Sequence, residues 1–333
     1  MRGPNRARRA FLRQIGSVGI SAWAAGRCAY SVYAQNPPDV PPVVVVVRMP
    51  GLSEATGDAQ RSAYARLLDV ALARLGLNWA RVAQPADVVG IKVNCLGGPL
   101  MSTSPQLAAA VADGVLRAGV SPDRVIVFDR EDRELIAAGY EISKDPARVQ
   151  VYGTDSSPAG YEEKLTQARS VSTRLSTIVT EQCTRLISLP IAKDHMIAGV
   201  TGAMKNYFGC IASPNKYHAD VCDPYVADLF SHRVFRSRHA LAVCDAATLL
   251  YEGGPHDSPD HHYAYDGIIA GLDPVATDRV IWAIIEGVRA EKGLGPLIDD
   301  GRSPTYLASA SALGLGCCDF ESIQVVQEEL PGR

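Results

Sequence analysis

The sequence predicts an α/β fold with a largely parallel sheet and helices on both faces. Short segments rich in Val, Ile and Leu alternate with longer segments whose apolar residues recur at helical spacing, and this alternation is typical of parallel βαβ units. Several apolar segments lack a polar residue at every second position, as expected of strands buried on both faces. If the domain is divided, its two lobes should meet near residues 150–185.

The first strands follow from local composition. Residues 43–47 are five consecutive valines, which predict a buried strand. Residues 61–75 repeat apolar side chains at helical spacing, and residues 87–95 (DVVGIKVNC) predict a second strand that ends in polar residues. Residues 124–128 (RVIVF) predict a third strand, so three elements of the expected sheet lie in the first part of the domain.

Cap residues mark two of the predicted helices. Ser104 precedes Pro105, a pair that favours a helix start, and Gly119 favours its end after Ala118. Asp273 caps a second helix, over residues 274–288. A glycine-rich turn should lead into a further helix near residue 203. The remaining predicted strands cover residues 149–152, 184–192, 238–244, 267–272 and 323–326.

The first residues carry the pattern of an export signal. Arg8 and Arg9 stand before a Phe-Leu pair, and an apolar stretch over residues 15–25 follows, as in twin-arginine signal peptides. Val32 and Ala34 occupy the two positions that signal peptidase reads, which predicts cleavage after Ala34. We therefore expect a twin-arginine signal peptide over residues 1–34, a Pro-rich linker over 35–42 and the α/β domain over 43–333.

This leader implies partners and a location. The twin-arginine translocase and signal peptidase are the expected partners, and the mature protein should be periplasmic or secreted. The apolar stretch is shorter than the roughly 20 residues that a membrane helix needs, so we expect no membrane association after cleavage. The net charge of −3 includes the basic leader, and the more acidic mature domain makes nucleic acid an unexpected partner.

Cysteine spacing excludes two classes of metal site. None of the eight cysteines forms a C-x-x-C pair, whereas iron–sulfur clusters and zinc ribbons need clustered thiolates. We expect no iron–sulfur cluster. For the adjacent Cys317 and Cys318 we expect one buried residue and one disulfide partner.

Polar side chains stand at the ends of four predicted strands. Lys92 and Asn94 end the second strand, Asp129 follows the third, and Lys193 and Asp245 follow two later strands. The carboxyl ends of parallel strands meet at one edge of a sheet, where ligands bind. We therefore expect these groups to share a crevice.

All seven histidines lie between His195 and His262, and histidine is a common metal ligand and proton carrier. His195 and His218 flank Lys205 and Asn206, so a loop could bring these groups together. For the other four considered, we favour a solvated or capping role: His232, His239, His261 and His262.

Lys205 follows a segment rich in glycine and small residues, over residues 199–204. Glycines permit close backbone approach, and the N–H groups of a helix start can face an anion. No Walker sequence is present, so a nucleoside triphosphate is not supported. A small carboxylate or phosphate-like anion is the expected ligand.

Four segments resemble the domain-of-unknown-function family DUF362. They are residues 89–94 (VGIKVN), residues 199–209 (GVTGAMKNYFG), His218 and residues 269–278 (IAGLDPVATD), and residues 313–316 (LGLG) are similar to the family's ending. The resemblance covers roughly residues 88–287. Many members carry twin-arginine leaders and some append iron–sulfur modules; this chain has the predicted leader and lacks the cluster cysteines. The family has no settled activity.

Together these observations predict an exported metal- or cofactor-dependent enzyme that acts on a small anionic substrate. The alternative is a periplasmic ligand- or metal-binding protein without catalysis. The predicted catalytic residues are His195, Lys205 and His218, with His195 and His218 also as ligands of a divalent metal. The predicted substrate-binding residues are Lys92, Asn94, Lys193 and Asn206, and Asp129, Asp245 and Asp273 are predicted to orient them.

Overall fold

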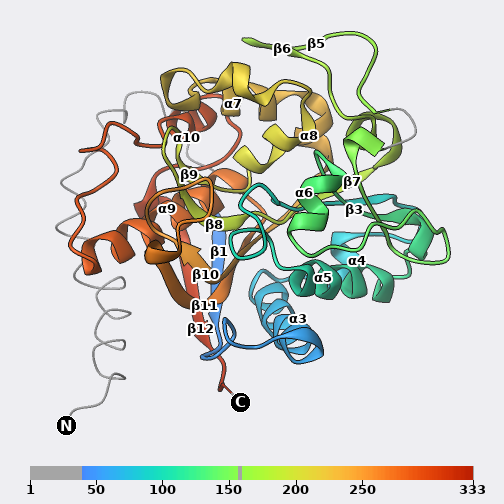
Figure 1. The fold of residues 1–333 in the computed structure, drawn as a ribbon, viewed down its shortest axis with the longest axis horizontal. Helices are drawn as coiled ribbons and strands as arrows, with labels where there is room; N and C mark the ends of the chain where they lie inside the picture. The colour runs from blue at the N-terminus through green and yellow to red at the C-terminus, as the bar shows by residue number, and fades with distance from the viewer. Residues whose placement is uncertain (1–39, 157–159, 333) are drawn as a thin grey trace. The chain divides into compact units, whose positions relative to one another are not determined.

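A computed structural model describes residues 40–156 and 160–332 of the chain (Figure 1). The predicted signal peptide and residues 35–39 of the predicted linker lie outside the described residues. The described residues belong to one compact unit, and no division near residues 150–185 separates them into two lobes. None of their helices is long and apolar enough to cross a membrane.

The described strands form a ten-stranded sheet and a two-stranded hairpin. Along its main path the sheet has the order β12-β1-β11-β10-β7-β2-β3-β4, with β8 paired to β10 and to β9. The strands are β1 (Val43–Arg48), β2 (Val89–Lys92), β3 (Val125–Asp129), β4 (Gln150–Gly153), β7 (Arg185–Ser188), β8 (Ile191–His195), β9 (Gly199–Thr201), β10 (His239–Leu250), β11 (His262–Gly271) and β12 (Gln324–Glu329), with β5 (Thr166–Ala168) and β6 (Val171–Thr173) in the hairpin.

The predicted α/β fold with a largely parallel sheet is confirmed. Strands β10, β7, β2, β3 and β4 run parallel to their neighbours in this order, and β12 is parallel to β1. Strand β11 departs from this pattern, since it is antiparallel to both β1 and β10. It follows β10 through a connection that contains no crossover helix, and such a connection favours antiparallel pairing.

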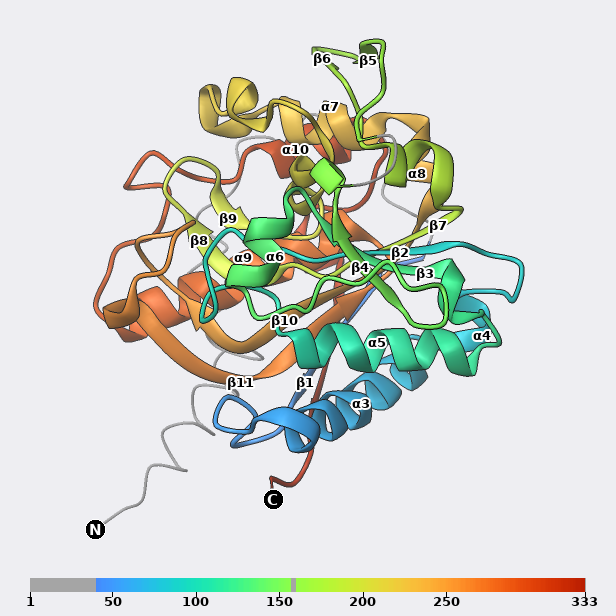
Figure 2. The same cartoon turned by 45° about the vertical axis from the view of Figure 1, so that its right-hand side comes forward.

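Helices cover both faces of the sheet (Figure 2). Alternate valines of β1 belong to different clusters: Val45 and Val47 pack with α3 and α5, while Val44 and Val46 pack with α9. The helices are α3 (Gly57–Arg74), α4 (Trp79–Val82), α5 (Pro105–Arg117), α6 (Asp132–Ala137), α7 (Tyr225–Ser231), α8 (Arg233–Arg238), α9 (Pro274–Glu291) and α10 (Tyr306–Ala312).

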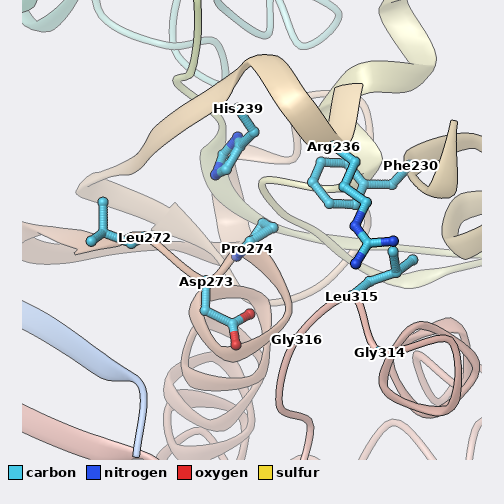
Figure 3. Close-up of a pocket in the computed structure, with 9 residues that line it drawn as sticks. All are labelled: Phe230, Arg236, His239, Leu272, Asp273, Pro274, Gly314, Leu315 and Gly316. Carbon is cyan, nitrogen blue, oxygen red and sulfur yellow. The ribbon is translucent and has the colours of Figure 1, made fainter. Parts of the chain in front are cut away.

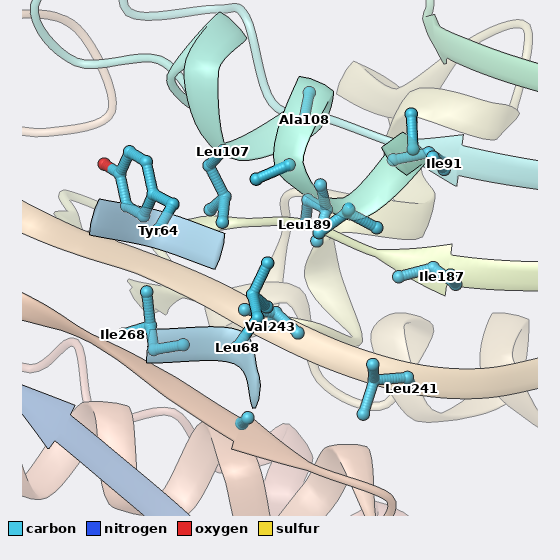
Figure 4. Close-up of a cluster of buried hydrophobic side chains, with 14 of the residues drawn as sticks. Tyr64, Leu68, Ile91, Leu107, Ala108, Ile187, Leu189, Leu241, Val243 and Ile268 are labelled. Atoms are coloured by element: carbon cyan, nitrogen blue, oxygen red, sulfur yellow. The ribbon is translucent and has the colours of Figure 1, made fainter. Parts of the chain in front are cut away.

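The side chains of α3 and α5 pack against the sheet in one buried apolar cluster. Leu68 of α3 and Leu107 of α5 lie among Ile187 of β7 and Val243 of β10 in one buried cluster (Figure 4). Each of these side chains is at most 1% exposed. Burying one such side chain contributes roughly 1.5–3 kcal/mol to the free energy of unfolding. The packing of these apolar side chains fixes the position of the sheet, and the candidate site lies at the ends of its strands.

Two predicted caps are present. The Ser104 side chain accepts the N–H of Gln106 at the start of α5, and Asp273 accepts the N–H groups of Val275 and Ala276 at the start of α9. These local signals determine helix starts because the first N–H groups of a helix have no intrahelical acceptor.

The segment after residue 183 differs from its prediction. One strand was expected over residues 184–192, but two strands, β7 and β8, are separated by Leu189 and Pro190. Pro190 has no N–H to donate to a ladder, which favours a break there. The helix expected near residue 203 is the short 3₁₀ helix η4 (Lys205–Cys210).

Further short helical turns are η1 (Pro122–Arg124), η2 (Thr154–Ser156), η3 (Ile178–Gln182), η5 (Pro214–Tyr217), η6 (Asp220–Cys222), η7 (Pro259–His261) and η8 (Phe320–Ser322). Several of them occupy the segment from Asp194 to Tyr265. The seven described cysteines are all free, so the disulfide predicted at the Cys317–Cys318 pair is not formed within the described residues.

Candidate functional site

The hairpin of β8 and β9 presents basic side chains on one face. Side chains alternate along a strand, so Lys193 and His195 point to one face of β8 and Asp194 to the other. Thr201 of β9 stands opposite Lys193 in the antiparallel ladder, which places its side chain on the same face as the lysine. On the opposite face, Arg302 forms an ion pair of 2.5 Å with Asp194. This ion pair connects the hairpin to the segment that contains Arg302.

Lys193 is fully buried. Its Nζ donates a hydrogen bond of 3.0 Å to the carbonyl oxygen of Met101. Burial lowers the pKa of this amine to about 8; Asp129 opposes that change, and the positive charge of Lys205 adds to it. An ammonium in this environment gains from any anion that enters it, because burial without a counterion disfavours its charged form.

The hydrogen bonds of His195 determine its tautomer. Its Nδ1 accepts the backbone N–H groups of Ile197 at 3.1 Å and Ala198 at 3.2 Å, so in the neutral ring the proton is on Nε2. Burial, followed by the charges of Lys205, His218 and Lys193, lowers the pKa of His195 to about 2. The ring is therefore a neutral N–H donor at physiological pH.

Lys205 and His218 complete the group. The rings of His195 and His218 stack with their centroids 5.5 Å apart, and Lys205 Nζ lies 3.4 Å from His218 Nε2. His218 Nδ1 lies 3.0 Å from the carbonyl oxygen of Pro214, to which it must donate, so Nε2 carries the lone pair of the neutral ring. Burial lowers the pKa values of Lys205 and His218.

We call Lys193, His195, Lys205 and His218 the cationic cluster. Within the described residues no carboxylate forms an ion pair with either of its lysines. Three buried polar atoms of the described residues also lack a hydrogen-bond partner: Thr201 Oγ1, opposite Lys193 in the ladder, Ser102 Oγ and Asn94 Oδ1. Buried groups of this kind are normally paired, and an anion with its hydration water would supply the missing partners.

Lys92, Asp129 and Asn206 form a hydrogen-bonded network of their own. Lys92 Nζ lies 2.6 Å from Asp129 Oδ1 and 3.2 Å from Asn206 Oδ1. The Asn206 amide donates to the Lys92 carbonyl at 2.8 Å and to Ser188 Oγ at 3.1 Å, which uses both of its donor hydrogens. Lys92 and Asn206 therefore connect the ends of β2, β3 and β7, and their predicted roles in substrate binding remain predictions.

Two predicted orienting residues lie elsewhere. Asp245 accepts the Tyr64 hydroxyl at 2.8 Å and the Ser104 N–H at 2.9 Å, so it connects β10 to α3 and α5 and contacts no imidazole. Asp273 caps α9 and accepts the Cys317 N–H. Asn94 is half-buried and donates its backbone N–H to Thr103 Oγ1.

A divalent metal fits the cationic cluster poorly. No group of three or more His, Cys, Asp or Glu side chains among the described residues could hold a metal ion. His195 Nδ1 already accepts two N–H groups, so its Nε2 keeps a proton and offers no lone pair. His218 Nε2 is available but faces the Lys205 amine. The predicted metal ligation by His195 and His218 remains a prediction.

Comparison with known proteins identifies the family of this chain. A family model described as a domain of unknown function, DUF362, matches residues 89–283. The chain belongs to the DUF362 family. A search of curated proteins found no match. A crystal structure of a protein from Thermotoga maritima, solved as a structural-genomics target, is similar with a TM-score of 0.42 and 10% identity, and the match covers 72% of this chain and 59% of that chain.

The segments that carry the DUF362 resemblance meet in space. The Asp278 carboxylate accepts the N–H groups of Ala203 and Met204, so the start of α9 holds the turn that leads into Lys205. Gly202 is required at this contact because a Cβ there would overlap the Asp278 carboxylate. Gly209 lies so close that a Cβ would stand 2.6 Å from Lys92 Nζ.

The sequence interpretation missed several residues at this DUF362 site. Thr201 was assigned to a glycine-rich turn, although it belongs to β9. Ser102 precedes the predicted helix cap and carried no motif. Cys222 is fully buried and close enough for its pKa to respond to the charge of Lys205. Thr201 follows Gly199 by two residues, and a tight hairpin that turns before Gly199 would pair it with Lys193. This spacing was the sequence signal that could have identified Thr201.

Proposed function

We propose that this DUF362 protein is an exported enzyme that binds a small anionic substrate at the cationic cluster and transfers a proton there. The observation that carries the proposal is the burial of Lys193, His195 and Lys205 beside the half-buried His218, without a carboxylate paired to either lysine. Lys193, His195 and Lys205 are 0%, 4% and 8% exposed. Each buried ammonium lacks the counterion that normally accompanies such a charge.

The side chains suggest a division of roles. Lys193 and His195 Nε2–H are donors on one face of β8, so they suit the binding of a carboxylate or phosphate oxygen. Lys205 adds its charge to the binding of the anion. It also forms the proton-transfer pair with His218, because an amine of lowered pKa lies 3.4 Å from an imidazole lone pair. General acid–base catalysis requires such a pair, in which one group can donate a proton and its neighbour can accept it.

Binding is tested by thermal unfolding with phosphate, sulfate, oxalate and lactate as probes. At least one of these anions should raise the Tm of the wild type in a concentration-dependent way, because a ligand that binds the folded state stabilises it. The Lys205→Met variant should lose this effect. Lys216→Met is the matched control: Lys216 is an exposed lysine of the same segment, with its Nζ over the Tyr217 ring.

A lack of stabilisation by all four anions, or equal stabilisation of wild type and Lys205→Met, would contradict the binding site. Catalysis is tested by following deuterium incorporation from D₂O into the anion that binds. Binding without exchange or any other turnover would favour a periplasmic binding protein over an enzyme.

A metal-dependent enzyme is the rival for the same side chains. Elemental analysis of protein purified from its native compartment distinguishes the two. A metal that is bound stoichiometrically by the wild type and lost in a His195→Ala, His218→Ala double variant would support the metal-dependent enzyme. Export itself is part of the proposal, with the twin-arginine translocase and signal peptidase as partners, and rests on Arg8, Arg9 and the apolar stretch after them.

A further inference from the structure

A cavity lies at the start of α9, and no residue of the cationic cluster lines it. It has a volume of about 370 Å³, and its lining includes Arg236, His239, Asp273 and the 314–316 segment. Figure 3 shows His239, Arg236 and Phe230 on one side of the cavity, with Asp273 and Gly316 on the other. Two segments of the DUF362 resemblance therefore meet here, although the proposed function uses neither.

His239 supplies a buried donor without an acceptor. Its Nδ1 lies 2.8 Å from the Tyr207 hydroxyl. Tyr207 is fully buried and stays protonated, because burial raises its pKa well above the usual value. The hydroxyl therefore donates to Nδ1, and the proton of the neutral imidazole is on Nε2. This Nε2 is buried and has no partner.

Arg236 adds a positive charge on the same side of the cavity. It is exposed, and no described side chain forms an ion pair with its guanidinium. The pocket view shows the guanidinium extending from α8 toward Leu315 (Figure 3). A guanidinium and an imidazole N–H on one wall present donors that match the two oxygens of a carboxylate.

Asp273 forms no ion pair with Arg236 among the described residues. One of its oxygens accepts the N–H groups of Val275 and Ala276, and the other accepts the N–H of Cys317. The carboxylate is thus held by backbone donors at a helix start, where a negative charge is stabilised. Gly316 packs directly against it, since a Cβ at this position would overlap the carboxylate.

The rest of the lining is largely apolar. Phe230, Leu272, Pro274 and Leu315 contribute side chains to the cavity. Ligand sites commonly combine such a lining with a few polar groups that orient the ligand. A purely inorganic anion would leave this surface without a partner.

We propose that this cavity is a second binding site, which takes a small carboxylic acid with an apolar body. The carboxylate lies against Arg236 and His239 Nε2–H, and the apolar body lies against Phe230 and Leu315. This site is independent of the anion bound at the cationic cluster.

Titration calorimetry with benzoate tests the proposal, with benzamide as the neutral analogue. Benzoate should bind the wild type, and Arg236→Gln should weaken it by about tenfold or more, because a charge-assisted hydrogen bond is lost. Arg233→Gln is the matched control on α8, since Arg233 is also exposed but does not line the cavity. Its affinity for benzoate should stay within about twofold of the wild type.

The Lys205→Met variant separates this site from the cationic cluster. Benzoate affinity that survives Lys205→Met and falls in Arg236→Gln supports the second site, whatever the fate of the proposed function. The opposite pattern would assign the carboxylate to the cationic cluster and overturn the inference. So would an absence of benzoate binding, equal binding of benzamide, or an equal loss in Arg233→Gln.

Discussion

Lys193 and Lys205 lie within electrostatic reach of each other in the interior of the protein. Burial lowers the pKa of Lys193 to about 8, and the charge of Lys205 contributes to that change. Neither lysine has a carboxylate partner within the described residues. The pH dependence of ligand binding should therefore reveal the cluster.

We predict that anion affinity falls as the pH rises from about 7 to about 9. The bound anion stabilises the ammonium form of Lys193, so binding near pH 8 is coupled to proton uptake. Calorimetry in two buffers of different ionisation enthalpy measures this uptake. Lys193→Met should remove it, and an affinity independent of pH in the wild type would argue against Lys193 as an anion contact.

We predict a second effect of Lys193 on stability. Its folded-state pKa of about 8 is depressed below the usual lysine value of 10.5. The contribution of this lysine to the free energy of unfolding is therefore fully present above about pH 10.5 and is lost as the pH falls through about 8. At pH 7 the Lys193→Met variant should be more stable than the wild type by roughly 2 kcal/mol. The gain from removing the buried charge follows from about 1.36 kcal/mol per pKa unit, and the loss of the hydrogen bond to Met101 reduces it.

Urea unfolding at pH 7 and pH 10 measures this difference, which should shrink at the higher pH. A variant that is less stable than the wild type at pH 7 would show that the hydrogen bond to Met101 outweighs the cost of burying the charge.

The buried Lys92–Asp129 pair should be sensitive to removal of one partner. Asp129→Asn leaves the Lys92 charge buried without compensation, and we expect the free energy of unfolding to fall by about 3–5 kcal/mol. Asp113→Asn is the control, because Asp113 pairs with Arg61 at 2.6 Å but is 36% exposed along its side chain. Its loss should cost less than about 1 kcal/mol in the same urea titration.

Gly202→Ala should disturb the turn before Lys205. The added Cβ would overlap the Asp278 carboxylate, and we expect a destabilisation of about 1–3 kcal/mol with weaker anion binding. Gly295→Ala is the control, since its Cβ would make an ordinary contact of 3.5 Å with Asp299. Thermal unfolding with and without the anion measures both effects; a variant with unchanged Tm and affinity would show that the turn adapts freely.

Replacing Arg8 and Arg9 with lysine should block export. The twin-arginine route reads this pair, so the precursor should accumulate in the cytoplasm, as fractionation and immunoblotting would show. Replacing Arg2 and Arg6 with lysine is the matched control and should leave export intact. Equal export of both variants would be evidence against this route.

Elements with strong local signals could be predicted from the sequence. Ser104 and Asp273 cap their helices as expected, because the preference of such residues for the first N–H groups acts within a few residues. The antiparallel pairing of β11 with β1 could not be predicted in this way. It depends on two segments far apart in the chain.

The candidate site likewise has features that could be predicted from the sequence and features that could not. His195, Lys205 and His218 were expected together, and they lie together. Lys92 and Asn206 were expected beside a substrate; the structure shows them hydrogen-bonded to each other, and their role in binding remains a prediction. Residue type indicates which groups can bind an anion, whereas the partner of a buried polar group depends on tertiary packing.

The ion pair between Asp194 and Arg302 has a practical consequence. Arg302 and β1 both lie outside residues 89–283, the part that the DUF362 model matches. An excised fragment with those limits would lose both β1 and β12, which would leave β11 without its neighbour on that side, and Asp194 would be buried without its guanidinium. The minimal folding unit of this protein is therefore larger than the segment by which its family is recognised.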